Sequence, residues 1–214
     1  PTRRSSDLIR PLQLRRAAME VLGRGGRRAA CSIDTRTGTD SVRIMTYNVH
    51  SCIGMDGRLS PSRIARVIAQ FQPHIVALQE LDVGRRRTLG HDQARLIADH
   101  LNMDLHFHPA LRFEEEQYGD AILSTLPLRL IKSGPLPGLS GSPQLEPRGA
   151  LWAKIRVDGQ AIHVINTHLG LRRRERLEQI RALLGPDWLE HPQRQGPAIL
   201  CGDFNAFPNS EVHR

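Results

Sequence analysis

The sequence alternates short apolar segments, each ending in polar residues, with segments that have the apolar spacing of a helix. VRIMTYNV at 42–49 and PAILCGDFN at 197–205 have the length and composition of buried strands. Between them, Ile64, Val67 and Ile68 recur on one helical face. A chain of this kind must bury its apolar side chains between layers of sheet and helix.

A hairpin signal follows later in the chain. ALWAKIRV at 150–157 and AIHVINTHL at 161–169 are joined by Asp158-Gly159, a dipeptide typical of tight hairpin turns. Alternating strands and helices followed by hairpins predict an α/β (α+β) sandwich, in which two sheets pack together with helices outside. We expect one domain, residues 42–214. No segment approaches the length of about 18 apolar residues that a membrane-spanning helix needs.

Polar side chains typical of metal and phosphate sites follow the apolar runs at four places. Strand ends of layered α/β folds meet at one rim, so residues distant in sequence can form one site there. Glu80 is a hard oxygen ligand suited to Mg²⁺ or Mn²⁺, and Asn48 can orient the metal's shell through its amide oxygen. Asp203 can orient or deprotonate a water molecule. Asn205 and His168 can donate hydrogen bonds to phosphoryl oxygens.

Six motifs in this order resemble those of the endonuclease/exonuclease/phosphatase superfamily with the DNase-I-like fold: TYNVH, ALQE, GDAILS, EPRGAL, NTHL and GDFNA. The resemblance covers residues 42–207. It implies a two-sheet β-sandwich flanked by helices, and Mg²⁺-dependent cleavage of phosphoester bonds by attack of water. The sequence has no GxSxG, P-loop or HExxH motif, which disfavours the acyl-transfer, Walker-type and zinc-protease chemistries.

The resemblance also implies a role for each matching residue. It assigns metal binding to Glu80 and Asn48. It assigns phosphate contact to His168, and the orientation of water and phosphate to Asp203 and Asn205. His168, Asp203 and Asn205 form the predicted catalytic set.

Four further residues have open assignments. Arg148, in EPRGAL, either contacts the substrate phosphate or forms a salt bridge at the base of a loop. Tyr118 and Asp120 precede a strand and are expected at the rim of the site, although relatives often have asparagine in place of Asp120. His50 either faces the metal shell or is a solvated loop histidine.

The basic excess of the chain lies mainly near its start. The formal net charge is +8, and the first 40 residues hold nine arginines against four acidic residues. Residues 1–41 are predicted to be a basic arm outside the domain. Residues 1–8, PTRRSSDL, resemble a translated sequencing adapter and are expected to be foreign to the protein.

The superfamily pattern closes with a Ser-Asp-His-like segment, which the sequence does not show after Phe207. We therefore expect the domain to be truncated at its C-terminus. The 214 residues expressed alone are predicted to be inactive or unstable, because a core sheet would lose its last strands.

Composition and motif detail bear on the substrate. The nearly balanced charge of the domain and the 4% of aromatic residues do not favour specific DNA binding. EPRGAL and NTHLGL resemble a bacterial subgroup related to eukaryotic lipid-remodelling proteins, which implies a lipid headgroup or another small phosphodiester as substrate. A nuclease acting on DNA or RNA stays open, as does a catalytically incomplete domain that binds phosphate or metal. No obligate protein partner is inferred, and the expected location is the cytoplasm or the periphery of a membrane.

Overall fold

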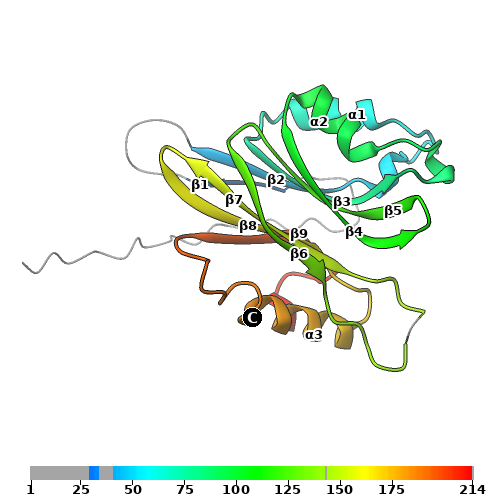
Figure 1. Ribbon diagram of the computed structural model, residues 1–214. Helices are drawn as coiled ribbons and strands as arrows, with labels where there is room; N and C mark the ends of the chain where they lie inside the picture. The colour runs from blue at the N-terminus through cyan, green and yellow to red at the C-terminus, as the bar shows by residue number, and fades with distance from the viewer. Residues whose placement is uncertain (1–28, 34–40, 143, 214) are drawn as a thin grey trace, which may run out of the picture.

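Two sheets pack face to face, with helices on the two outer faces (Figure 1). The computed structural model describes residues 29–33, 41–142 and 144–213. The first sheet contains β1 (Ala29–Ile33), β2 (Val42–Asn48), β3 (Ile75–Val83), β4 (Asp104–Phe113) and β5 (Glu116–Ser124). Their spatial order is β1, β2, β3, β5, β4.

The second sheet has four strands, and its strand order follows the chain. These are β6 (Leu128–Pro135), β7 (Gly149–Val157), β8 (Gln160–His168) and β9 (Ala198–Asp203). The pair β7 and β8 turns at Asp158 and Gly159, which both have positive φ, 45° and 80°. Two positive φ values in a two-residue loop are those of a type I′ turn, so the predicted hairpin is confirmed. The sandwich of two sheets with helices outside is thus confirmed.

Within the described residues, three α-helices cover the sheets (Figure 1). α1 (Pro61–Ala69) and α2 (Gln93–Leu101) lie on the first sheet, and α3 (Arg173–Leu184) lies on the second. The side chains of Ser60 and Asp92 cap α1 and α2 by accepting hydrogen bonds from backbone N–H groups of the first turns. Short 3₁₀ helices in the described part of the chain are η1 (His50–Cys52), η2 (Arg86–Thr88) and η3 (Glu211–His213). In the described ranges, no helix is long and apolar enough to span a membrane.

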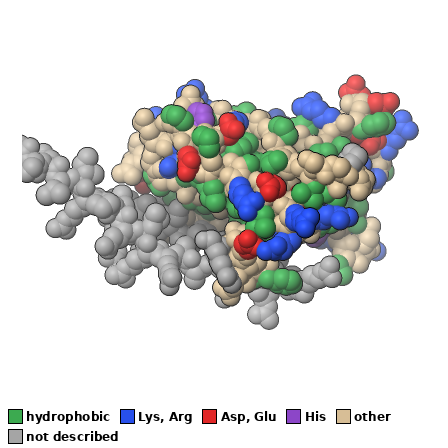
Figure 2. Space-filling model, turned by 90° about the horizontal axis from the view of Figure 1, so that it is seen from below, with side chains coloured by type: hydrophobic (Ala, Val, Ile, Leu, Met, Phe, Trp, Pro, Cys, Tyr) green, Lys and Arg blue, Asp and Glu red, His purple; other side chains and the backbone are tan. Residues whose placement is uncertain are grey.

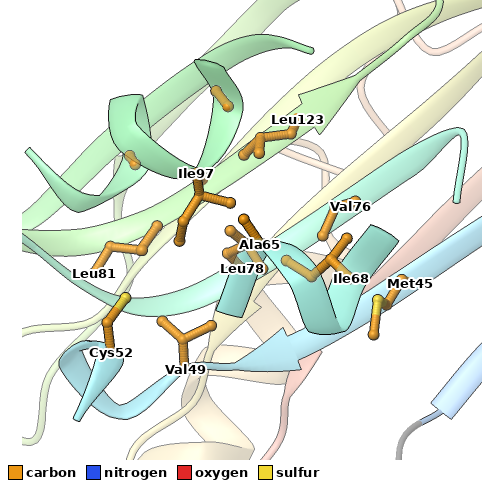
Figure 3. Packing of buried hydrophobic residues seen from close by; sticks show 13 residues of the cluster. Met45, Val49, Cys52, Ala65, Ile68, Val76, Leu78, Leu81, Ile97 and Leu123 are labelled. Carbon is orange, nitrogen blue, oxygen red and sulfur yellow. The ribbon is translucent and has the colours of Figure 1, made fainter. Parts of the chain in front are cut away.

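Apolar side chains fill three layers, and neighbouring residues of one strand face different layers. Met45 packs under α1 and α2 (Figure 3), whereas Ile44 lies between the sheets. In the same way Leu151 faces the inter-sheet layer, and Trp152 faces α3. This period of two is the strand pattern that the sequence analysis used. Each such side chain contributes about 1.5–3 kcal/mol through its burial.

The directions of four strands bring their carboxyl ends to one end of the sandwich. β2 runs parallel to β3, and β8 runs parallel to β9. β9 also packs across β2 and β3. The carboxyl ends of these four strands therefore lie at the same end of the sandwich.

The first sheet begins earlier in the chain than the sequence predicted. β1 pairs antiparallel with β2 along its whole length, from Ala29 opposite Thr46 to Ile33 opposite Val42. These five residues belong to the sheet and not to the predicted basic arm. The rest of that predicted arm, residues 1–28 and 34–40, including the adapter-like residues 1–8, lies outside the described residues.

One glycine permits the close approach of β8 and β9. Gly202 has φ 142°, and a Cβ atom placed on it would lie 1.8 Å from the carbonyl oxygen of Thr167. No side chain fits at this distance, because the obstacle is the backbone of the neighbouring strand. Gly202 thus fixes the position of the residues that follow it.

Replacing Gly202 with alanine is expected to lower the free energy of unfolding by about 3 kcal/mol or more, because β8 must move. Gly57→Ala is the matched control. Gly57 also has a positive φ, 70°, but nothing lies within 4 Å of its Cβ position. The Gly57 variant should therefore lose only about 1 kcal/mol of unfolding free energy. Urea titrations followed by circular dichroism measure both losses, and equal losses would contradict the close-approach explanation.

Candidate active site

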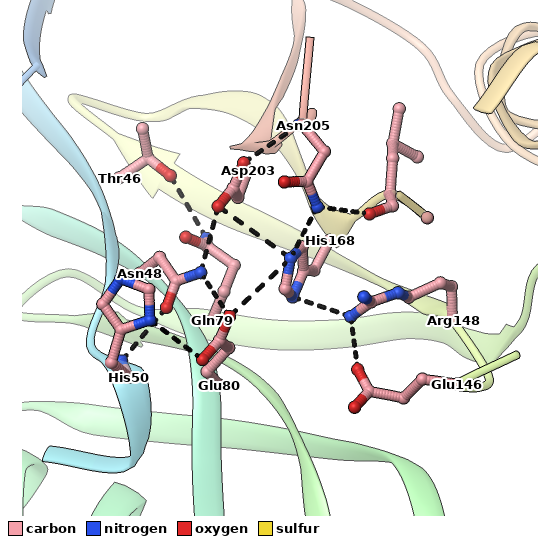
Figure 4. Close-up of polar contacts among 12 residues, drawn as sticks. Thr46, Asn48, His50, Gln79, Glu80, Glu146, Arg148, His168, Asp203 and Asn205 are labelled. Carbon is pink, nitrogen blue, oxygen red and sulfur yellow. Dashed lines mark hydrogen bonds and ion pairs between the residues drawn. The ribbon is translucent and has the colours of Figure 1, made fainter. Parts of the chain in front are cut away.

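The five residues predicted to form the site converge at the carboxyl ends of β2, β3, β8 and β9 (Figure 4). Asn48 lies at their centre. Its Nδ2 donates hydrogen bonds to Glu80 Oε1 at 2.7 Å and to Asp203 Oδ2 at 3.0 Å. One amide of the first sheet therefore joins a carboxylate of its own sheet to a carboxylate of the other.

A β-bulge orients Glu80. The pairing of β3 with β5 shifts register between Leu78 and Leu81, and Glu80 between them has φ 60°. The sequence analysis placed Glu80 after an apolar run, whereas β3 continues past Glu80 to Val83. A bulge re-aims a side chain without ending the strand, and bulges are frequent next to active sites. The bulge places the Glu80 carboxylate at the strand ends and leaves it partly exposed.

His168 is almost fully buried and is surrounded by polar groups. Its Nδ1 lies 2.9 Å from Arg148 Nη1, and its Nε2 lies 3.0 Å from Asn205 Nδ2. Nε2 is also 3.9 Å from Glu80 Oε1 and from Asp203 Oδ2. Burial first, and then the positive charge of Arg148, lower the pKa of His168 to about 4. The imidazole is therefore neutral at neutral pH.

Asp203 is held as a carboxylate. Burial, the largest single influence, raises its pKa, but the hydrogen bonds from the Asn48 side chain and the backbone N–H of Asn205, together with the neighbouring histidines, outweigh it. The pKa of Asp203 is lowered in consequence. Asn205, with φ 48°, closes this tight turn by donating its N–H to Asp203 Oδ1 at 2.9 Å.

The structure also places Arg148 and His50, whose roles the sequence left open. Arg148 is 7% exposed and forms a salt bridge to Glu146 Oε1 at 2.6 Å, besides its contact with His168. The salt-bridge alternative is therefore present, and phosphate contact by Arg148 stays a prediction. His50 is largely exposed, and its Nδ1 lies 3.1 Å from Glu80 Oε2. It contacts the predicted metal ligand from the solvent side.

Tyr118 and Asp120 lie inside β5 and not before it, as the sequence analysis had them, and both are nearly buried beside the site. The guanidinium groups of Arg85 and Arg87 lie over the Tyr118 ring, 5.9 and 5.6 Å from its centroid. Burial raises the pKa of Tyr118, and the charges of Glu80 and Glu146 add to this rise. Burial also raises the pKa of Asp120 to about 8, although Arg148 and the backbone N–H of Glu80 oppose the rise. Asp120 thus carries a proton at neutral pH, which makes it chemically close to the asparagine of its relatives.

Sequence reasoning missed three polar residues that support the site. Gln79 Nε2 donates to Asn166 Oδ1 at 2.7 Å, between the two sheets. Both residues are completely buried. Glu146 holds Arg148. The available signal was the position of these residues inside quoted motifs, directly before or two residues before a predicted site residue.

The oxygen donors fit a hard divalent cation. In the described part of the chain, no group of three or more His, Cys, Asp or Glu side chains is arranged to hold a metal ion by itself. Mg²⁺ needs less, because it keeps several waters and takes one or two carboxylates together with substrate phosphate. Glu80 supplies one carboxylate, and Asp203 lies across Asn48 from it. The same residues do not make the closed nitrogen and sulfur set that a structural zinc site uses.

Comparisons with known proteins agree on one family. The sequence profile of the Endonuclease/Exonuclease/phosphatase family matches residues 45–214. The YbhP protein of Escherichia coli K12 is 26% identical over 185 residues, which cover 81% of this chain and 70% of that protein.

Solved structures share the fold. An endonuclease/exonuclease/phosphatase from Beutenbergia cavernae is 25% identical with a TM-score of 0.61, over 77% of this chain and 47% of that one. The mannosyl-6-phosphatase Bt3783 of Bacteroides thetaiotaomicron is 19% identical with a TM-score of 0.63, over 81% of this chain and 68% of that one. The chain thus spans about half the length of the first protein and about two thirds of the second. These likenesses confirm the predicted DNase-I-like sandwich.

Asp120→Asn is expected to make the metal-free protein more stable at neutral pH. The raised pKa means that folded Asp120 keeps its proton up to about pH 8, whereas the unfolded chain loses it near pH 4. Its contribution to stability is complete below pH 4 and is lost as the pH rises to about 8. The gain in unfolding free energy of the variant over wild type should therefore grow by up to about 1.4 kcal/mol per pH unit in this window, and then level off. Urea titrations in EDTA from pH 4 to 9 measure it, and a gain independent of pH would contradict the protonated Asp120.

Proposed function

Because the chain belongs to the endonuclease/exonuclease/phosphatase family, whose members are phosphoric ester hydrolases, we propose that it hydrolyses a phosphoester by attack of water with Mg²⁺ or Mn²⁺ as cofactor. The observation that carries the proposal is the meeting of two carboxylates, the His168 imidazole and the Asn205 amide at one end of the sandwich. A phosphoester needs both kinds of group around it, since its oxygens are anionic and the attacking water must lose a proton.

Each residue has a part in this chemistry. Glu80 would hold the cation, with its carboxylate oriented by Asn48 and contacted by His50. The bound cation supplies Lewis-acid polarisation of a phosphoryl oxygen. Asp203, kept ionised by its hydrogen bonds, is suited to orient the attacking water and accept its proton. Asn205 and His168 provide N–H donors for phosphoryl oxygens.

Exposed apolar side chains around the site favour a lipid-like substrate. Five strongly exposed large side chains belong to segments that follow the carboxyl ends of β2, β3, β4, β8 and β9. They are Met55, Leu89, Phe113, Leu171 and Phe207. β4 runs in the same direction as β3, because both pair antiparallel with β5. All five segments thus leave from the end that carries the site. Apolar side chains beside arginines are typical of surfaces that bind a membrane interface.

A nucleic-acid substrate receives less support from the charge distribution. On the face that carries α3, acidic and basic side chains lie next to one another (Figure 2). A backbone-binding surface for DNA is typically a continuous basic patch. We therefore propose a lipid headgroup or another small phosphodiester as substrate, at the periphery of a membrane.

Glu80→Gln is expected to abolish Mn²⁺ binding, because glutamine has nearly the same shape as glutamate but lacks the negative charge that attracts the cation. Mn²⁺ binding, measured by electron paramagnetic resonance, is the first readout, because it reports on the metal site directly. Hydrolysis of bis(p-nitrophenyl) phosphate is the second. Glu178→Gln, which removes an exposed carboxylate paired with Arg181 on α3, is the control and should bind Mn²⁺ like wild type. Equal Mn²⁺ binding by the Glu80 variant would contradict the metal assignment.

Phe113→Ser is expected to weaken binding to vesicles of anionic phospholipid about tenfold, because a phenyl group that no longer inserts into the membrane costs about 1.5 kcal/mol of binding free energy. Vesicle sedimentation measures this binding. Hydrolysis of the water-soluble bis(p-nitrophenyl) phosphate should not change. Leu184→Ser, on an exposed leucine at the end of α3, is the control and should leave vesicle binding intact. Preferential cleavage of plasmid DNA over phospholipid by wild type would favour the nuclease alternative.

A further inference from the structure

Both ring nitrogens of His168 face hydrogen-bond donors. Arg148 Nη1 is 2.9 Å from Nδ1, and Asn205 Nδ2 is 3.0 Å from Nε2. A neutral imidazole has one N–H donor and one acceptor nitrogen, so it can accept only one of these two contacts. The tautomer of His168 therefore decides which neighbour it satisfies.

Arg148 settles this choice, because a guanidinium has no acceptor atom and keeps its charge in proteins. A hydrogen on Nδ1 would point at a cationic N–H group in a buried environment. Nδ1 must therefore be the acceptor, and the hydrogen of the neutral ring is on Nε2. The Glu146 carboxylate holds Arg148 in place at 2.6 Å, and the arginine is only 7% exposed. Such charge-assisted hydrogen bonds are short and strong.

In this tautomer the two neighbouring nitrogens, His168 Nε2 and Asn205 Nδ2, are both hydrogen-bond donors. Asn205 Nδ2 donates to the carbonyl oxygen of Leu169 at 2.8 Å, which fixes the amide so that its nitrogen is turned towards His168. His168 Nε2–H and Asn205 Nδ2–H then lie side by side without bonding to each other. The nearest oxygens of Glu80 and Asp203 are 3.9 Å from Nε2, beyond hydrogen-bond distance. One anionic oxygen placed beside both donors would satisfy them together.

We propose that Arg148, held by Glu146, is a positioning residue that sets the Nε2–H tautomer of His168 and so turns it into a donor for the substrate phosphoryl oxygen. This proposal rests on the proposed function for its substrate. In this proposal Arg148 acts through His168, which is an alternative to the direct phosphate contact that the sequence left open. In the opposite tautomer, Nε2 would present a lone pair to the phosphoryl oxygen and repel it.

The tautomer is measured directly by two-bond ¹H–¹⁵N correlation spectra of the ¹⁵N-histidine-labelled protein. Wild type should show His168 with hydrogen on Nε2. In Arg148→Met the only remaining donor is Asn205, so His168 should change to the Nδ1–H form. Arg148→Lys keeps a cationic donor and should restore the Nε2–H form.

His163 is the internal control. Its Nδ1 accepts from Trp152 Nε1 at 3.0 Å, and its Nε2 lies 3.1 Å from the carbonyl oxygen of Gln195. A ring placed in this way carries its hydrogen on Nε2, and neither contact involves Arg148. The His163 signals should therefore be the same in all three proteins. They also report whether the variants are folded.

Binding of inorganic phosphate in the presence of Mn²⁺ connects the tautomer to the substrate. Phosphate affinity should fall at least tenfold in Arg148→Met and recover in Arg148→Lys, while Mn²⁺ affinity stays near that of wild type. Unchanged phosphate affinity in a variant with the altered tautomer would overturn the role towards the substrate.

A wild-type His168 with hydrogen on Nδ1, or an Arg148→Met variant that retains the Nε2–H form, would overturn the positioning role. The wild-type spectrum needs no variant, so the proposal is testable even if a variant does not fold. Failure of wild type to bind Mn²⁺ would contradict the proposed function instead, and it would leave the tautomer result in force.

Discussion

The position of the two sheets relative to each other depends on one buried hydrogen-bonded pair, Gln79 of β3 and Asn166 of β8. Gln79 Nε2 donates to Asn166 Oδ1, and Asn166 Nδ2 donates to the carbonyl oxygens of Leu78 and Ala121 in the first sheet. A buried amide without partners costs several kcal/mol, so a sliding movement of one sheet over the other would leave these groups unsatisfied. Apolar packing alone is less selective, because it tolerates small shifts. The polar pair therefore sets the register in which the site forms.

Each member of this pair lies close to a site residue in the chain. Gln79 precedes Glu80, and Asn166 lies two residues before His168. Fixing the pair consequently fixes the separation of Glu80 and His168 across the sheets. The bulge at Glu80 and the close approach at Gly202 then determine the exact positions of the Glu80 and Asp203 carboxylates. Such departures from ideal strand geometry are found where function outweighs local stability.

The sequence predicted most of the fold because its signals are local. The apolar period and the Asp158-Gly159 turn each act within a few residues, and the structure retains both. It did not predict β1, because a five-residue segment between arginine-rich and polar stretches has no clear alternation. The membership of β1 in the sheet comes from pairing with β2, which is a tertiary effect.

The same distinction applies to the site. Which residues come together follows from strand ends meeting at one rim, and all five predicted residues do so. The partners of Arg148 could not be predicted, because they depend on the side-chain geometry of a loop and two strands. Nor could the protonation of Asp120, which follows from complete burial beside another carboxylate rather than from its neighbours in sequence.

The arrangement separates the site into two sides with opposite hydrogen-bonding character. Glu80 and Asp203 present acceptor oxygens, and Asn205 and His168, in the proposed Nε2–H tautomer, present N–H groups. The two sides are too far apart to satisfy each other, since His168 Nε2 is 3.9 Å from either carboxylate. A molecule that bridges them must offer anionic oxygens to the donors and be compatible with a cation held by the carboxylates. A phosphoester meets both conditions, whereas a neutral ester or amide offers no charged oxygen before reaction. Both sides of the site are thus compatible with the phosphoester substrate that we propose.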